Sequence, residues 1–172
     1  YASSDDLVVS VRVEHTDISD SRWYNGSGIN RPVEIEVHEQ VRVREHGTAF
    51  TTLTADASSA TFRIATALAN DTAETATVHV HHELRSLTSG RVHAFALDAE
   101  VPAGASASQV EITAEMPQPD LWSDTNPHLY QLTTTLIWTH SGTERRAVYE
   151  ETVGIRTFRF DADRGFSING EP

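Results

Sequence analysis

Carboxylates are the first side chains to consider for catalysis, because the sequence holds 25 Asp and Glu residues against 13 Lys and Arg. Two carboxyl groups about 5–5.5 Å apart can act as acid/base and nucleophile in the hydrolysis of a glycosidic bond. Glu150 and Glu151 are neighbours on a predicted strand, so their side chains point to opposite faces and cannot converge. No other spacing identifies such a pair, and the sequence predicts solvated carboxylates rather than a catalytic centre.

Histidines raise the question of a metal site, since His79 and His81 share one face of a predicted strand and His93 belongs to a neighbouring strand. Zinc would need a third or fourth ligand at about 2.0–2.2 Å, and no pattern supplies one. A polar outer face of a sandwich strand is the alternative. Residues 161–165 have the acidic spacing of a calcium loop but lack its terminal Glu, so they predict a turn. The chain has no Cys, and we expect neither a metal nor a cofactor.

A long loop is predicted over residues 17–31, where the alternation of apolar and polar residues stops. Sugar rings stack on aromatic faces and form hydrogen bonds with Asp, Asn and Arg, so this loop is a candidate for contact with a carbohydrate. The alternative is that the same side chains pack the loop against neighbouring domains. The candidate substrate-side or interdomain residues are Asp20, Arg22, Trp23, Tyr24 and Asn25.

The elements that must position these side chains are predicted to be β-strands. Apolar and polar residues alternate with period 2 over residues 7–13, 33–37 and 62–68, and helical spacing is sustained nowhere. Turn signals such as Asn70-Asp71 and Ser89-Gly90 separate the runs. An antiparallel β-sandwich is therefore the expected architecture. Further strands are expected over residues 49–55, 75–84, 91–101, 108–116, 129–138 and 145–158.

Length and charge exclude several classes of protein. A complete (β/α)₈ barrel needs roughly 250 residues, and this chain has 172. A formal net charge of −12 repels phosphate, so we expect no binding to nucleic acid or to anionic membranes. The sequence does not indicate in which cellular compartment the protein acts. It shows no signal peptide, and the lack of Cys is compatible with either side of a membrane.

A second group of residues has a spacing that predicts an ordered crossing between strands. Pro119 and Pro127 bracket a segment that cannot be helical, because each proline disfavours helix in the residue before it. Trp122 and Tyr130 are expected to be ordinary core aromatics. Gly154 permits a close backbone approach. Arg156 is a candidate partner for a carboxylate across a domain boundary.

Two blocks of sequence resemble glycoside hydrolase family 2, particularly its β-galactosidases. The first block, residues 21–33 (SRWYNGSGINRPV), resembles a segment near the end of the family's sugar-binding jelly-roll domain. The second block resembles the end of the family's immunoglobulin-like domain and the lead-in to its catalytic barrel. It consists of PDLWS (119–123), NPHLYQL (126–132), VGIRT (153–157) and FSINGEP (166–172).

The resemblance implies an all-β fold, an immunoglobulin-like antiparallel sandwich preceded by partial jelly-roll strands. The implied domains are the end of the jelly roll (1–40), the sandwich (41–160) and a lead-in to the barrel (161–172). Related β-galactosidases place an Asp of the corresponding loop near the mouth of the active site, and Asp20 is the nearest match to it in this sequence. The implied structural motif residues are Trp122, Pro127, Tyr130, Gly154, Arg156, Asn169 and Gly170.

The function that the resemblance implies is that of a non-catalytic spacer within a retaining β-glycosidase, most directly a β-galactosidase. Both catalytic glutamates of the family lie in the barrel, so this chain alone would lack them, and its strand-like start and Asn169-Gly170 end are expected of a piece of a longer protein. Its partners would be the other domains of that protein and, through them, a carbohydrate. The alternative is a free-standing carbohydrate-binding or adhesion sandwich that uses Trp23 and Tyr24 as its platform.

Overall fold

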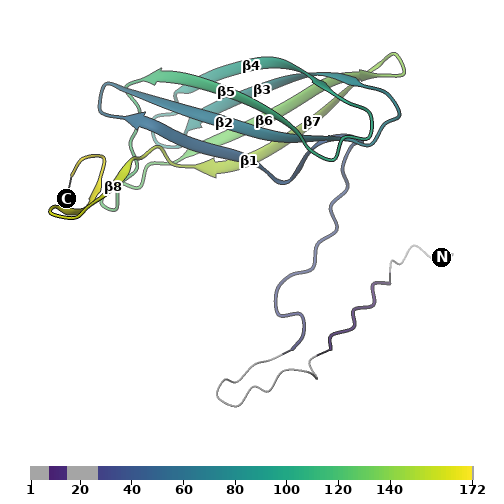
Figure 1. The fold of residues 1–172 in the computed structure, drawn as a ribbon, viewed down its shortest axis with the longest axis horizontal. Coiled ribbons are helices and arrows are strands. Elements are labelled where there is room, and N and C mark those ends of the chain that lie inside the picture. Colours follow the sequence, from purple (N-terminus) through teal and green to yellow (C-terminus); the bar gives the residue numbers. More distant parts are fainter. Residues whose placement is uncertain (1–7, 15–26, 172) are drawn as a thin grey trace. The chain divides into compact units, whose positions relative to one another are not determined.

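A computed structural model describes residues 8–14 and 27–171 of the chain, which forms two units, residues 1–37 and residues 38–172. The described residues contain no helix, and therefore none long and apolar enough to cross a membrane. The nine strands found among these described residues all belong to the second unit, and Figure 1 shows their arrangement. The fold is all-β and antiparallel, as the sequence predicts.

The first unit differs from the prediction, because its described residues, 8–14 and 27–37, contain no strand. The apolar side chains that alternate there are exposed, with Val8 at 78% and Val33 at 62%. A half-buried strand needs a neighbour for its backbone hydrogen bonds and a layer to cover its apolar face. The described part of this unit supplies neither, so the expected partial jelly-roll strands are not formed in it.

Seven strands of the second unit form the two layers of a sandwich. One sheet has three strands in the order β1-β2-β5, and the other has four in the order β4-β3-β6-β7. The bounds are Val41–Ala55 (β1), Ser59–Asn70 (β2), Ala76–Ser86 (β3), Val92–Val101 (β4), Ser108–Pro117 (β5), Tyr130–His140 (β6) and Thr143–Val153 (β7). This order matches an immunoglobulin-like sandwich in which the fourth strand pairs with the third.

The core is formed by apolar side chains that occupy every second position of the strands and face inward from both sheets. In β3 the buried residues Val78, Val80 and Leu84 alternate with outward-facing neighbours. Two apolar clusters fill the space between the sheets, one around Leu136 and one around Phe62. Between them along β2, β3 and β6 lies a layer of three buried polar residues, which we call the polar layer: Thr66, His82 and Thr134.

β1 starts earlier than the sequence predicts. The charged residues at 38–47 interrupt the apolar alternation, so the sequence does not indicate a strand there. Val41 and Val43 are nevertheless buried in the core and pair with β2. The pairing is interrupted after Val43 by a bulge, in which His46 has a φ of 53°. A Cβ at Gly47 would lie 2.7 Å from the Arg44 carbonyl oxygen, so the bulge needs glycine at that position.

The last predicted strand, residues 145–158, is in fact two elements. β7 ends at Val153, and the chain continues into a separate hairpin of β8 (Phe158–Asp161) and β9 (Gly165–Ile168). The Asp161 carboxylate accepts hydrogen bonds from the backbone N–H groups of Asp163 and Arg164. This confirms the predicted turn at residues 161–165. Figure 1 shows β8 at the end of the sandwich where β7 finishes.

Candidate functional site

The five loop residues proposed to contact substrate or a neighbouring domain, Asp20, Arg22, Trp23, Tyr24 and Asn25, lie outside the described residues. Their role stays a prediction. The candidate site that the structure does describe is formed by the second group of motif residues. They gather at the end of the sandwich where β7 leads into the β8–β9 hairpin, and we call this region the C-terminal junction.

Trp122 ties the connection between β5 and β6 to the segment that follows β7. Its backbone N–H donates to the Ile155 carbonyl at 2.9 Å, and its own carbonyl accepts the Asn169 side-chain amide at 2.9 Å. It also forms an isolated bridge with Pro127. Trp122 belongs to neither core cluster and is only partly buried. The expectation that it is an ordinary core aromatic is therefore wrong.

The side chain of Arg156 stacks on the Trp122 ring. The guanidinium carbon lies 4.8 Å from the ring centroid, within the range of a cation–π contact. Gly154 makes room for this stack, because a Cβ there would lie 3.3 Å from one guanidinium nitrogen and 3.4 Å from the Trp122 side chain. The close approach expected at Gly154 is thus an approach to Trp122 and Arg156.

Asn169 and Gly170 anchor the hairpin to the same place. The Asn169 side-chain oxygen accepts the Thr157 N–H at 2.9 Å, and the Asn169 N–H donates to the Thr157 carbonyl at 2.8 Å. Both residues have positive φ, 51° for Asn169 and 85° for Gly170, a conformation that Asn and Gly tolerate best. These bonds close the base of the hairpin, and the Asn169 amide ties that base to the Trp122 carbonyl.

Tyr130 is the core aromatic of this region and is 1% exposed. Its hydroxyl oxygen accepts the backbone N–H of Asp120 at 2.7 Å. A tyrosine at the start of this strand that bonds back to the preceding connection is the tyrosine corner of immunoglobulin-like sandwiches. Burial raises the pKa of the Tyr130 phenol. The sequence predicts that Tyr130 is buried, but not that it closes a corner.

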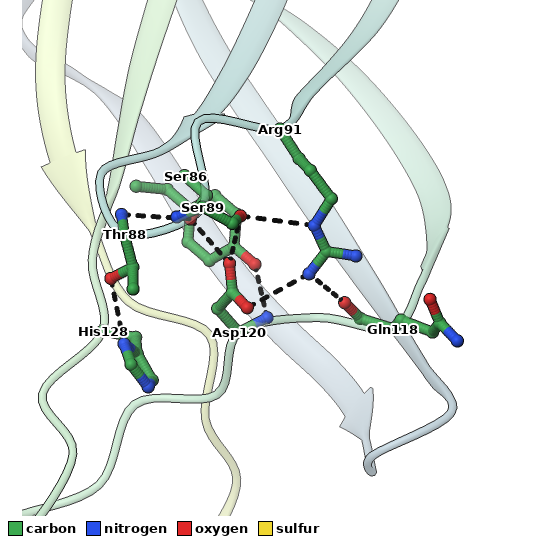
Figure 2. A network of polar contacts seen from close by, with 8 residues as sticks. Ser86, Thr88, Ser89, Arg91, Gln118, Asp120 and His128 are labelled. Atoms are coloured by element: carbon green, nitrogen blue, oxygen red, sulfur yellow. Dashed lines mark hydrogen bonds and ion pairs between the residues drawn. The ribbon is translucent and has the colours of Figure 1, made fainter.

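Asp120 is the centre of a polar network that the sequence does not predict (Figure 2). Its carboxylate accepts hydrogen bonds from Ser86 at 2.6 Å and Ser89 at 2.7 Å, and forms an ion pair with Arg91 at 3.1 Å. The Ser86 bond is the main cause of a lowered pKa at Asp120. Arg91 also donates to the Gln118 carbonyl. The network joins the β3–β4 turn to the segment that carries Trp122.

We expect Asp120→Asn to lower the free energy of unfolding by about 1–3 kcal/mol, because three donors lose a charged acceptor. Urea unfolding at pH 7 measures this effect. Asp124→Asn, an exposed carboxylate in the same connection, is the matched control and should change stability by no more than about 0.5 kcal/mol. Equal effects of the two variants would show that the network does not hold the connection.

The histidines considered as metal ligands do not converge. His79 and His81 lie on the outer face of β3, where His79 bonds to Asp98 at 2.7 Å. His93 pairs with buried Leu84 and therefore faces the other side of the sheet. Within residues 8–14 and 27–171, no group of three or more His, Asp or Glu side chains is arranged to hold a metal ion.

The opposite end of the sandwich is held by Asn70, a residue for which the sequence predicts only a turn. Its side chain is fully buried and forms four hydrogen bonds. The amide donates to the carbonyls of Glu74 at 2.8 Å and Val101 at 3.0 Å, and the oxygen accepts the N–H and hydroxyl of Thr72. Asn70 thus joins the β2–β3 loop to the end of β4.

One face of the β8–β9 hairpin is apolar and open to solvent. Phe158 is 62% exposed, Phe160 77% and Phe166 46%. The ring centroids of Phe160 and Phe166 lie 5.1 Å apart, and those of Phe158 and Phe160 lie 6.3 Å apart. The other face is polar and carries an ion pair between Arg159 and Asp161. Two-stranded hairpins need a covering layer for stability, so this apolar face is suited to packing against another protein surface.

Comparison with known proteins places these features in one family. A family model described as glycosyl hydrolases family 2 matches residues 41–156, from the start of β1 to Arg156. A beta-galactosidase of Bacteroides ovatus, BoGH2A, is 34% identical over 165 residues, which is 95% of this chain. The chain spans 19% of the length of that curated relative.

Solved structures agree on the fold. A family 2 glycosyl hydrolase from Bacteroides cellulosilyticus matches 77% of this chain with a TM-score of 0.67 and 25% identity, and the match covers 18% of that protein. The beta-glucuronidase 2 of Bacteroides uniformis matches 77% of this chain with a TM-score of 0.66 and 26% identity, and the match covers 16% of that protein.

Proposed function

The chain belongs to glycosyl hydrolase family 2, and from this membership we propose that its sandwich is a non-catalytic spacer between a sugar-binding domain and a catalytic barrel. Residues 1–37 would be the end of the sugar-binding jelly roll, and the β8–β9 hairpin would lead into the barrel. The catalytic carboxylates would belong to the barrel. The chain would then act by fixing the positions of the two domains that flank it.

The observation that carries this proposal is the C-terminal junction. A hairpin with three exposed phenylalanines is held to the sandwich through Asn169, Thr157 and Trp122. A spacer needs a surface that contacts the neighbouring domain and a rigid attachment that fixes the position of that surface. Exposed apolar patches of this kind mark contact sites. Tyr130 stiffens the same end from inside the core, and the partly exposed network around Asp120 stiffens it from the surface. Both requirements of a spacer are therefore met in one place.

For the whole protein we propose hydrolysis of O-glycosyl bonds in β-galactosides. The support is the resemblance of residues 21–33 to β-galactosidases together with the name of the 34% identical relative. A β-glucuronide is the second candidate, because the structural relatives include a beta-glucuronidase. Hydrolysis of nitrophenyl β-galactoside against nitrophenyl β-glucuronide by the full-length protein decides between them.

Phe160→Asp tests the spacer role in the full-length protein. Burying a phenylalanine stabilises a contact by about 2–3 kcal/mol, so a carboxylate at this position should weaken docking of the sandwich on the catalytic domain. We expect the calorimetric unfolding of the two domains, coupled in the wild type, to separate into two transitions. Glycosidase activity should fall in parallel as the catalytic domain loses its support.

Ser167→Asp is the control, because Ser167 pairs with Arg159 on the polar face of the same hairpin. It adds the same charge without touching the phenylalanines and should leave the coupling intact. If Phe160→Asp leaves unfolding and activity unchanged, the hairpin does not dock a second domain. The spacer role would then be wrong.

A further inference from the structure

A groove opens beside the C-terminal junction, between the edge strands β1 and β7 of the two sheets. It has a volume of about 430 Å³, enough for several side chains. Phe50 lines it on the β1 side and is stacked on Phe62 of the core at a centroid distance of 5.0 Å. The groove is lined mainly by Phe50, Thr52, Val153, Gly154, Arg156 and Phe158.

Arg156 is the one cation among the residues that line this groove. No Asp or Glu among the described residues forms an ion pair with it, whereas Arg42, Arg91 and Arg159 each have a carboxylate partner. Other described arginines also lack an ion pair, but none of them lines this groove: Arg31, Arg44, Arg145, Arg146 and Arg164. Arg156 is exposed, so its guanidinium is available to a ligand.

The stack on Trp122 prepares Arg156 to bind a planar anion. A guanidinium that lies over an aromatic ring keeps its in-plane N–H groups free, and these match the two oxygens of a carboxylate. Gly154 leaves room for the arrangement, because a Cβ there would lie 3.3 Å from a guanidinium nitrogen of Arg156 and would require that side chain to shift slightly. The groove thus combines apolar walls with one oriented donor group.

We propose that this groove receives an Asp or Glu side chain from the catalytic domain of the same protein, paired with Arg156. This inference rests on the proposed spacer function, and it names the chemistry of the contact. A carboxylate fits because a single cation neutralises one negative charge, and the apolar walls accommodate the neighbouring residues of a protein segment. A free phosphate would need more cations to overcome the acidity of the chain. Phe158 also joins the groove to the apolar face of the hairpin, so one partner surface can cover both.

The sequence offers an unusually clean test, because all 13 basic residues are Arg and the chain contains no Lys. Arg156→Lys therefore introduces the only side-chain amine of residues 1–172, so any cross-link through a side-chain amine of these residues starts at position 156. In the full-length protein, a zero-length carbodiimide joins an amine to a carboxylate that it touches. Peptide mapping by mass spectrometry then identifies that carboxylate. We expect a cross-link from position 156 to one Asp or Glu of the catalytic domain.

Arg145→Lys is the matched control, since Arg145 is exposed at the other end of β7. It supplies the same amine away from the groove and should give no cross-link to the catalytic domain. Circular dichroism of both variants checks that they are folded. A position-156 amine that links only to residues 38–172, or to nothing, overturns the proposal.

The Phe160→Asp result separates the two ideas. If Phe160→Asp uncouples the domains but position 156 gives no cross-link to the catalytic domain, the spacer function stands and the assignment of Arg156 is wrong. If neither variant behaves as expected, both fall. A second variant, Arg156→Gln, should weaken the coupling of the two unfolding transitions without any chemical probe, and an unchanged coupling would count against the ion pair.

Discussion

Asn70→Asp is expected to lower the free energy of unfolding of the chain by about 3–5 kcal/mol. The substitution keeps the shape of the side chain and the acceptor that Thr72 uses. It replaces the two N–H donors by a carboxylate oxygen, which would face the carbonyls of Glu74 and Val101. Because the side chain is fully buried, the new charge has no access to water. Urea unfolding at pH 7, followed by tryptophan fluorescence, measures the loss.

Asn126→Asp is the matched control, because Asn126 is exposed in the connection between β5 and β6. The same chemical change there should cost no more than about 0.5 kcal/mol. Asn70→Ala separates the charge from the hydrogen bonds, since it removes the bonds without adding a carboxylate. If Asn70→Asp is as stable as the wild type, Asn70 does not hold this end of the sandwich together.

The strands of the sandwich were predictable wherever one face meets the core and the other meets solvent. In β3 the alternation of buried Val78 and Val80 with exposed neighbours is visible in the sequence as period 2. The start of β1 was not predictable, because Val41 and Val43 stand among charged residues and a bulge follows them. Period 2 fails at a bulge, since the extra residue changes which side chains face inward.

The same alternation was misleading in residues 8–14 and 33–37. Period 2 reports that a segment is able to form a strand with one buried face, but strand formation also needs a partner. Val37 is 93% exposed in the structure. A period-2 pattern shows that a segment favours a strand conformation. It gives no information on whether the partner strands are present.

The C-terminal junction was partly predictable. Trp122, Gly154, Arg156 and Asn169 could be selected from the resemblance to the family, and they do lie together. The network around Asp120 could not, because it joins Ser86 and Ser89 to a carboxylate more than thirty positions away. Serine is common in turns, so nothing in the sequence marks these two. Only the fold brings them to Asp120.

The polar layer makes the stability of the sandwich depend on pH through His82. This side chain is 1% exposed, and its Nδ1 lies 3.0 Å from the Thr134 hydroxyl oxygen. Burial, with a smaller contribution from the nearby positive charge of His81, lowers the pKa of His82 from 6.5 to about 4. Between these two values the unfolded chain binds a proton that the folded chain does not. Stability attributable to His82 is therefore complete above about pH 6.5 and falls as the pH drops toward 4.

The size of this effect follows from the shift, since each pKa unit corresponds to about 1.4 kcal/mol, giving a loss of about 3 kcal/mol by pH 4. His82→Gln cannot titrate and retains a group that can bond to Thr134, so its unfolding free energy should fall less steeply over the same interval. His81→Gln, on the outer face of the same strand, should keep the wild-type slope. Urea unfolding at half-unit steps from pH 7 to pH 4 gives the three slopes. Parallel slopes for His82→Gln and the wild type would mean that His82 binds its proton as readily in the folded chain as in the unfolded chain, and that the polar layer tolerates a charge between two apolar clusters.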